Sequence, residues 1–449
     1  MTFRSAALLL AFVLAAGPLT AQPLDFGSAD DVFETPRSGD LPAQEVRLGV
    51  FAGPAYLDAW RSALRAEAYV RQGRAALSLG ATLHPAAGGF YGSEADDAYD
   101  ALRALQYARL EPTATSRLYL RMGPMERLTL GSGTLVRGFS TTSAWDERTV
   151  GVEGAAEIGR VAVAGFTDDV RLNGVVGGQI QWRTGRRLGP VDRVRLGVAA
   201  VHDLGRGGGL RGDSALTGVE ATLGGALFGD ATFSVGPFVT AAHYLGGGTG
   251  LGGGLAVRAD NLGEALRAQA RVAVIGTSSQ FVSGAVGPFY NLSNGVDRIV
   301  VADSYYDADP ALTLAGTPRD SLARGVDVVA DLRAVVFGRA EVSQYFRRHI
   351  GADLASAYGL RLAARLPREA RVELAVEQQG FRGLWALLFG TDTEENTLVL
   401  DVAVPVGRTH VFVRSRYGYR RVPESDAVGA GRFLIERRFE PLVGLRLIR

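Results

Sequence analysis

Short stretches in which apolar and polar residues alternate recur along most of this chain, and this pattern constrains its fold most strongly. In the stretch 409–417, Val411 and Val413 share one face, and Arg414 and Arg416 share the other. A period of two is typical of a β-strand with one apolar and one polar face. Similar segments, separated by turn residues, fill 115–275 and resume after 323. The chain is therefore predicted to be all-β.

Length and hydropathy favour one large closed sheet. The chain has 449 residues, and no apolar run beyond its first 21 residues approaches the roughly 20 residues that a membrane-spanning helix needs. Any membrane residence must then come from strands. We predict a transmembrane antiparallel up-and-down β-barrel of about 18 strands, within a range of 16 to 20, because bacterial single-chain barrels have even strand numbers.

The N-terminal segment has the features of a secretory signal. Arg4 precedes an apolar core at 6–17, and the small residue Ala21 suits cleavage. We expect export through the Sec pathway, a leader or plug segment at 22–44, and a single barrel over 45–449. The expected location is the bacterial outer membrane.

Composition excludes several chemistries. All 48 basic residues are arginine, so Schiff-base and phosphate-loop lysines are ruled out. There is no cysteine, which removes thiol catalysis, thiolate-bound zinc and disulfides. A formal net charge of +1 argues against nucleic-acid binding. We expect no cofactor, no bound metal and no enzymatic activity.

The alternating strands assign charged residues to the lumen. An outer-membrane barrel has an apolar lipid face and a polar interior, and an arginine near the bilayer midplane would cost about 2–4 kcal/mol. Arginine outnumbers acid on the predicted inner face, which favours an anion-preferring pore and a small anionic solute as partner. Alternatively, other acids neutralise these arginines. The predicted pore-lining residues are Arg117, Arg121, Arg193, Arg195, Arg361, Arg365, Glu373, Arg414 and Arg416.

Several segments interrupt the strand pattern. Apolar spacing predicts short helices at 54–68 and 97–110. Long loops are expected at 84–116 and 276–323, and both are candidates to restrict a pore. A third loop is expected at 380–396, followed by four strands that close the chain.

One loop contains a string with possible chemistry. Tyr290-Asn291-Leu292-Ser293-Asn294-Gly295 resembles the His-x-Ser-Asn-Gly motif of the outer-membrane phospholipase family, in which the histidine activates the serine. Here Asn291 replaces that histidine and cannot accept the proton. A turn at Asn-Gly is the simpler interpretation.

From about residue 45 to residue 449 the chain resembles outer-membrane β-barrels. The stretch Arg127 to Arg137 (RLTLGSGTLVR), followed by GVEGAAEIGRVAVAGFTDDV, is similar to uncharacterised barrel proteins of Gram-negative envelopes. The resemblance implies contact with outer-membrane lipid and with the barrel assembly machinery. Gly444 and Leu447 fit the usual assembly signal, whereas the terminal Arg449 departs from the usual aromatic residue.

These observations favour a passive channel or transporter for small solutes. The main alternative is a non-conducting structural or assembly barrel with a filled lumen, which acidic partners for the inner arginines would support. A barrel lipid hydrolase and a secreted soluble all-β protein remain as further alternatives.

Overall fold

A computed structural model describes most of the chain beyond its N-terminal segment. The described residues are 44–57, 59–86, 89–90, 98–110, 117–125, 128–142, 148–172, 174–204, 216–229, 233–262, 266–287, 290, 299–300, 313–314, 317–318, 324–337, 340–350, 356–366, 370–379, 395–406, 409–421 and 433–448.

Within these residues, twenty strands form one closed antiparallel sheet in which each strand pairs with its neighbours in sequence. They are β1 (Gln44–Tyr56), β2 (Trp60–Gln72), β3 (Ala75–Leu83), β6 (Leu105–Leu110), β7 (Leu118–Gly123), β8 (Gly151–Ile158), β9 (Val161–Thr167), β10 (Val175–Arg183), β11 (Asp192–Asp203), β12 (Thr217–Ala226), β14 (Phe233–Tyr244), β15 (Thr249–Leu262), β16 (Leu266–Thr277), β20 (Gly325–Val336), β21 (Ala340–Ile350), β22 (Ala357–Arg365), β23 (Arg371–Gln379), β24 (Glu395–Val406), β25 (Thr409–Arg421) and β26 (Phe433–Ile448).

Several short strands and one short helix lie outside the twenty-strand ladder. The two-residue strand β13 (Phe228–Gly229) pairs with β14, and β17 (Ile299–Val300) adds to β26 in parallel. Two small hairpins are β4 (Pro85–Ala86) with β5 (Gly89–Phe90) and β18 (Thr313–Leu314) with β19 (Thr317–Pro318). The helix α2 (Tyr99–Arg103) has five residues. Among the described residues, no helix is long and apolar enough to cross a membrane.

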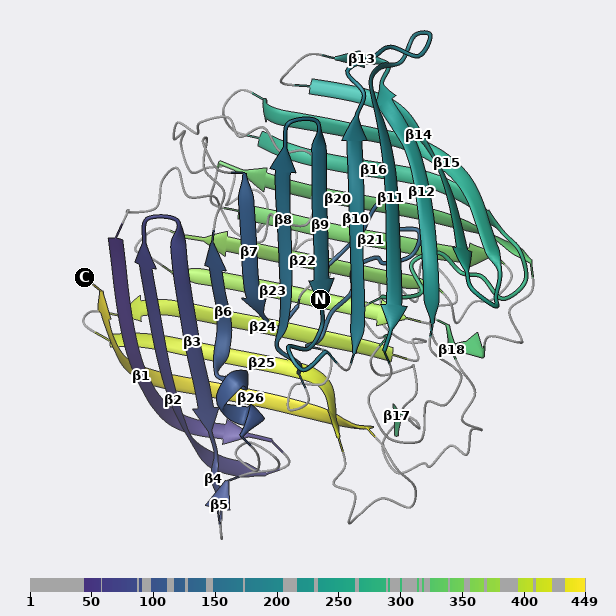
Figure 1. Ribbon diagram of the computed structural model, residues 1–449. Helices are drawn as coiled ribbons and strands as arrows, with labels where there is room; N and C mark the ends of the chain where they lie inside the picture. The colour runs from purple at the N-terminus through teal and green to yellow at the C-terminus, as the bar shows by residue number, and fades with distance from the viewer. Residues whose placement is uncertain are drawn as a thin grey trace, which may run out of the picture.

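The sheet closes where the first strand meets the last. β1 pairs antiparallel with β26, from Arg47 opposite Ile448 to Tyr56 opposite Phe439. Figure 1 shows β1 beside β26, with the strands of the front and back walls crossing in the view. That crossing is expected of strands tilted around a barrel axis.

The two ends of the barrel differ in their connections. At the end where β1 begins and β26 ends, consecutive strands are joined by eight residues or fewer. At the opposite end the connections include the long segments 84–104, 124–150 and 278–324. We call these the short-turn end and the long-loop end. Outer-membrane barrels place short turns in the periplasm and longer loops outside the cell.

Side chains alternate between the two faces of the wall. On β7, Leu118 and Leu120 are 45% and 47% exposed, whereas Tyr119 and Arg121 are buried. Among the described residues, the exposed aromatic side chains gather near the two ends, at Tyr56, Trp60 and Phe439 and at Trp182, Phe228 and Phe233. An apolar outer band flanked by aromatic girdles is the exterior of a membrane barrel.

The main apolar core lies inside the barrel. Segments 128–142 and 281–287, here called the infolded loops, leave the long-loop end and enter the lumen. Arg137 N–H donates to the Val286 carbonyl at 3.0 Å, which joins the two loops. Phe139 is fully buried among apolar side chains of both loops and of the inner wall from β9 to β14.

Several expectations from the sequence are corrected by this fold. The barrel has twenty strands, the upper limit of the predicted range and two more than the predicted value. Residues 54–68 form the ends of β1 and β2 instead of a helix. The loop helix at 97–110 is not confirmed, because only α2 is helical and β6 follows it.

Two strand predictions were also wrong. In the alternating stretch 127–137, expected as a strand, the described residues 128–137 belong to an infolded loop. There Gly131 and Gly133, with Gly138 just after the stretch, take positive φ angles that break an extended chain. After the loop at 380–396, three strands and not four complete the barrel.

Candidate functional site

A buried carboxylate fixes the first infolded loop to the wall. Glu220 of β12 is 2% exposed and accepts hydrogen bonds from the backbone N–H groups of Ser132 at 2.6 Å and Leu135 at 3.3 Å. Thr240 of β14 also contacts the hydroxyl groups of Ser132 and Thr134, at 3.0 and 3.2 Å. The wall therefore satisfies polar groups that the loop would otherwise bury without partners.

A second carboxylate fixes the other infolded loop. Asp327 of β20 is fully buried, accepts a hydrogen bond from the Ser283 N–H at 2.6 Å, and lies 2.6 Å from Nδ1 of His349. Arg347 of β21 donates to the carbonyl oxygens of Ser283 and Gly284 at 2.7 and 2.6 Å. Each infolded loop is thus held by charged groups of the barrel wall.

A cavity lies between the first infolded loop and the short-turn end of the barrel. Its volume is about 260 Å³. Thr129, Gly131 and Ser132 form its floor, and its sides come from the short-turn halves of strands between β10 and β22. At roughly 30 Å³ for each water, this space holds on the order of nine water molecules.

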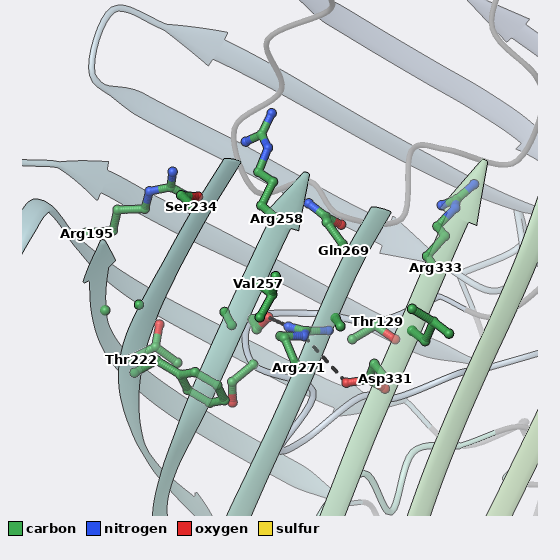
Figure 2. Close-up of a pocket in the computed structure, with 18 of the residues that line it drawn as sticks. Thr129, Arg195, Thr222, Ser234, Val257, Arg258, Gln269, Arg271, Asp331 and Arg333 are labelled. Atoms are coloured by element: carbon green, nitrogen blue, oxygen red, sulfur yellow. Dashed lines mark hydrogen bonds and ion pairs between the residues drawn. The ribbon is translucent and has the colours of Figure 1, made fainter. Parts of the chain in front are cut away.

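Inward-facing arginines recur along one cross-strand row of the cavity wall. In this row, residues on neighbouring strands are direct antiparallel partners. From β14 to β22 the row reads Ser234, Arg258, Gln269, Arg333, Ser343 and Arg361. Figure 2 shows Arg258 and Arg333 along the cavity wall, with Arg195 of β11 next to Ser234. Three arginines of this row therefore stand on alternate strands, β15, β20 and β22.

Small residues in the next row create the space. Gly236 and Ala256 pair across β14 and β15, one row deeper than Ser234 and Arg258. A Cβ atom on Gly236 would lie 1.6 Å from the Gly225 carbonyl oxygen, so the neighbouring backbone requires glycine there. The cavity thus exists partly because this wall lacks bulky inner side chains.

The floor combines two arginines with one carboxylate. Arg271 of β16 donates to the Gly131 carbonyl at 3.0 Å and lies 3.5 Å from Asp331. Arg137 of the infolded loop lies 3.3 Å from the same carboxylate. Figure 2 shows Arg271 facing Asp331. The lining includes six arginines and two carboxylates. Two of these arginines lie beside acids, Arg333 at 2.8 Å from Glu341 and Arg361 at 3.0 Å from Glu373.

On the opposite side of the barrel, charged residues pair across the strands. Arg414 of β25 contacts Asp401 of β24 through two nitrogens, at 3.0 and 2.8 Å, and Arg416 lies 3.6 Å from Asp401. Arg414 and Arg65 also lie over the Phe412 ring, with 5.2 and 4.6 Å to its centroid. We call this the ion-paired sector, formed by β1, β2 and β24 to β26.

Most of the arginines predicted to line a pore have acidic neighbours. Arg117 lies 3.2 Å from Glu157 and Arg121 lies 3.4 Å from Glu153, both across β7 and β8. Arg361 lies 3.0 Å from Glu373. These ion pairs favour the alternative in which acids neutralise the inner arginines. That these residues line a pore stays a prediction.

The predicted sites are not all in one place. Arg193, Arg195 and Arg361 line the cavity, whereas Arg414 and Arg416 belong to the ion-paired sector. The side chain of Arg365 lies outside the described residues. A β-bulge between Asp192 and Arg195 rotates the chain, so Val194, which strict alternation would place outward with Leu196 and Val198, is only 7% exposed.

Residues that the predicted set omitted form much of the cavity wall. Arg258, Arg271 and Arg333 all line the cavity. Arg271 and Gln269 alternate with the exposed Val272 and Val274 on β16, so the same period of two could have identified them. The sequence contains no signal for Arg137, because its segment alternates like a strand of the wall although it folds into the lumen.

The phospholipase-like string cannot be assigned a catalytic geometry. Ser293 and Asn291 lie outside the described residues. Tyr290, the first residue of that string, is buried in the apolar core and donates a hydrogen bond to Asp203 at 2.8 Å. In the described part, this string therefore contributes to packing.

A polar cluster ties together three connections at the long-loop end. The Tyr99 hydroxyl donates to Asp169 at 3.1 Å and accepts from the Val150 N–H at 2.8 Å, and Arg171 pairs with Asp169 at 2.7 Å. Burial raises the pKa of Tyr99 to about 12. Burial alone would raise the pKa of Asp169, but hydrogen bonds from Arg171 and Tyr99 hold it below its ordinary value.

These features define the class of the protein. A closed antiparallel barrel with an apolar exterior, aromatic girdles and a charged interior has the architecture of an outer-membrane β-barrel, which confirms the class predicted from the sequence.

Comparison with known proteins adds no closer assignment. No family model and no curated protein matches the chain. Among solved structures, the outer membrane protein OpdK of Pseudomonas aeruginosa is similar at 9% identity and a TM-score of 0.29, over 90% of this chain and 99% of that one. OpdL of the same organism is similar at 10% identity and a TM-score of 0.31, over 90% and 98%. Likenesses this weak carry no argument about function.

Proposed function

We propose that this protein is an outer-membrane channel for small solutes, with a route restricted by the infolded loops. The observation that carries the proposal is the cavity with six arginines inside a closed barrel. A wet, positively charged space inside such a wall has the character of a solute pathway. The long-loop end then faces the exterior and the short-turn end faces the periplasm.

The infolded loops narrow the proposed route. The apolar core around Phe139 occupies the lumen beside β9 to β14, so solutes pass the infolded loops instead of crossing that core. The cavity arginines then favour anions over cations, because a ring or arc of positive charge raises the local concentration of anions.

Single-channel recording tests this function. The refolded protein in a planar bilayer should give discrete current steps, and a salt gradient should give a reversal potential that favours anions. Replacing Arg258 and Arg333 together by glutamate should move the reversal potential towards cation preference. Arg160→Glu is the matched control, since Arg160 is exposed at a short turn between β8 and β9.

A non-conducting structural barrel is the second candidate. It is supported by the carboxylates that pair with Arg117, Arg121, Arg361 and Arg414. If the folded barrel carries no current, and the glutamate variant also carries none, the channel is wrong and this second candidate replaces it.

A further inference from the structure

We propose that the seam between β1 and β26 is a lateral gate, through which small apolar molecules dissolved in the bilayer enter the lumen. The gate lies where the pairing of these two strands is interrupted, in the half of β1 that leads to the long-loop end (Figure 1). This route goes beyond the proposed channel, because it opens through the barrel wall and not along the barrel axis.

Two prolines face each other across this seam. The pairing of β1 with β26 stops after Ala52 and returns only at Tyr56 opposite Phe439. The register is the same on both sides of the interruption, so Pro54 stands opposite Pro441 at its centre. Proline has no backbone N–H, and neither residue can therefore donate a hydrogen bond to the carbonyl group of the other.

The length of the interruption follows from the antiparallel ladder. Alternate pairs of such a ladder exchange two N–H···O bonds, and the pairs between them depend on these neighbours. A proline pair at an exchanging position removes both bonds, which also leaves the pairs on either side unsupported. The other ladders of the same two strands have no such gap, because β1 pairs with β2 over its whole length and β26 pairs with β25 from 433 to 444.

The two strands touch at the interruption in this structure. A Cβ atom on Gly53 would lie 2.5 Å from the Pro441 carbonyl oxygen and 3.2 Å from the Leu442 Cα atom. The backbones are therefore in contact without the hydrogen bonds that join the rest of the seam. Separating them breaks fewer hydrogen bonds than separating a paired stretch of the same length.

Opening requires movement of one hairpin tip only. The tip consists of residues 53–57 of the first strand and its connection, and residues 59–63 of the next. When it swings away from β26, one further pair is lost, Tyr56 with Phe439, and the pairs of residues 47–52 remain. Few amide groups then lose their partners, so a local opening is compatible with surrounding hydrocarbon, where unpaired amides are costly.

The wall is apolar on both of its faces at this point. On the lumen side, Phe51, Ala55 and Leu442 are buried in one apolar cluster. On the outer side, Val50 and Val443 are more than half exposed. An opening here joins an apolar surface inside the barrel to the bilayer outside, which suits an apolar molecule and disfavours an ion.

Labelling of a buried cysteine tests the gate. Because the chain has no cysteine, Ala55→Cys is a single reporter on the lumen side of the interruption. Ala403→Cys is the matched control, since Ala403 is a buried alanine of the same cluster on β24, which is paired on both sides. In protein refolded into lipid vesicles, pyrene maleimide dissolved in the bilayer should label Ala55→Cys at least tenfold faster than Ala403→Cys.

Restoring the missing donors should close the gate. Pro54→Ala with Pro441→Ala supplies both N–H groups and should slow labelling of Ala55→Cys by pyrene maleimide at least fivefold. Pro405→Ala, in β24, is the control and should leave the rate unchanged. Heat modifiability on a gel verifies that each variant is folded, and Leu442→Cys repeats the measurement from the opposite strand.

A water-soluble sulfonated maleimide separates the lateral route from an axial one. Its rate at Ala55→Cys should be low and should not respond to the proline changes. Equal labelling of Ala55→Cys and Ala403→Cys by pyrene maleimide, or a rate that ignores Pro54→Ala with Pro441→Ala, would overturn the gate. Faster labelling by the sulfonated reagent would also overturn it, in favour of entry along the axis. None of these outcomes depends on ion current, so the gate and the proposed channel can fail separately.

Discussion

The two sides of the barrel interior are stabilised by different forces. Beside β9 to β14 the lumen is filled by the infolded loops, whose apolar side chains surround Phe139. In the ion-paired sector the wall carries its own charges, and Asp401 joins Arg414 and Arg416. One side is stabilised mainly by a large apolar core, whereas the other combines ion pairs with a smaller apolar cluster that includes Phe51, Phe412 and Leu442.

This difference has a structural origin in the wall. The inner face of the packed side offers small or apolar residues such as Ala199 and Ala242, which leave room for a loop. The ion-paired sector instead places arginines and acids on facing strands. A barrel can therefore close one side of its lumen with a loop and leave the other polar, without changing the antiparallel ladder.

The largest expected effect is loss of packing in the filled side. Phe139→Ala should lower the free energy of unfolding by about 3–5 kcal/mol, because it leaves a cavity among Phe166, Tyr290 and their neighbours. Denaturant titration of the detergent-folded barrel measures this loss. Phe228→Ala, at an exposed site, is the control and should cost far less. Equal losses for both variants would contradict a packed core in the lumen.

The next effect concerns the wall carboxylate that holds the loop. Glu220→Ala leaves the N–H groups of Ser132 and Leu135 buried without an acceptor, which should cost about 2–4 kcal/mol. Glu220→Gln keeps an acceptor oxygen and should lose less. Hydrogen exchange at residues 132–135 should accelerate in the alanine variant. If exchange there is unchanged, the carboxylate does not hold the loop.

A smaller effect, sensitive to salt, is expected in the ion-paired sector. Asp401→Asn removes the charge shared by Arg414 and Arg416, and should cost about 2 kcal/mol at low salt. Raising the salt concentration should narrow the gap to wild type, because screening weakens these charges. The loss in Phe139→Ala should not depend on salt in this way. A salt-independent loss in Asp401→Asn would remove the distinction between the two sides.

The smallest effect on stability is expected from the polar cluster of Tyr99 and Asp169 at the long-loop end. Asp169 has a lowered pKa in the fold, so its contribution is present above its unfolded pKa of about 3.9 and is lost as pH falls below that value. Tyr99 has a pKa raised to about 12, so its contribution is present below about pH 10 and is lost between pH 10 and 12.

Exchange measurements locate this pH dependence. Hydrogen exchange at Val150, whose N–H donates to Tyr99, should be slowest between about pH 5 and 10 after correction for intrinsic rates. Asp169→Asn should abolish the acid limb at a cost of about 1 kcal/mol, because asparagine keeps an acceptor for the Tyr99 hydroxyl. An acid limb that persists in Asp169→Asn would assign it to another group.

The alternation of side chains was sufficient to predict the barrel and most of its inner face. It placed Arg121 inside, and the structure has Arg121 buried, whereas Leu118 and Leu120 of the same strand are exposed. It failed where alternation continues without a strand, as in 127–137, because glycines with positive φ bend that segment into the lumen. The alternation within one segment does not show whether another strand is available to pair with it.

The cavity was only partly predictable for a related reason. Arg195 and Arg361 could be placed inside from their own strands, but their meeting depends on the register of seven intervening pairings. The β-bulge at Arg193 and Val194 also changes which side chains face inward, and the alternation of the sequence does not predict this change. Register and bulges arise from contacts between distant segments, so the sequence of one strand does not encode them.

The seam between β1 and β26 also sets the order of events in assembly. Arg47 and its partner Ile448 are roughly 400 residues apart in sequence, so the first strand waits for the last before its free edge is paired. An unpaired strand edge cannot remain in hydrocarbon, where no water satisfies its amide groups. Stable insertion of this barrel and closure of its seam must therefore be completed together, and a chain that stops before β26 should be retained outside the membrane.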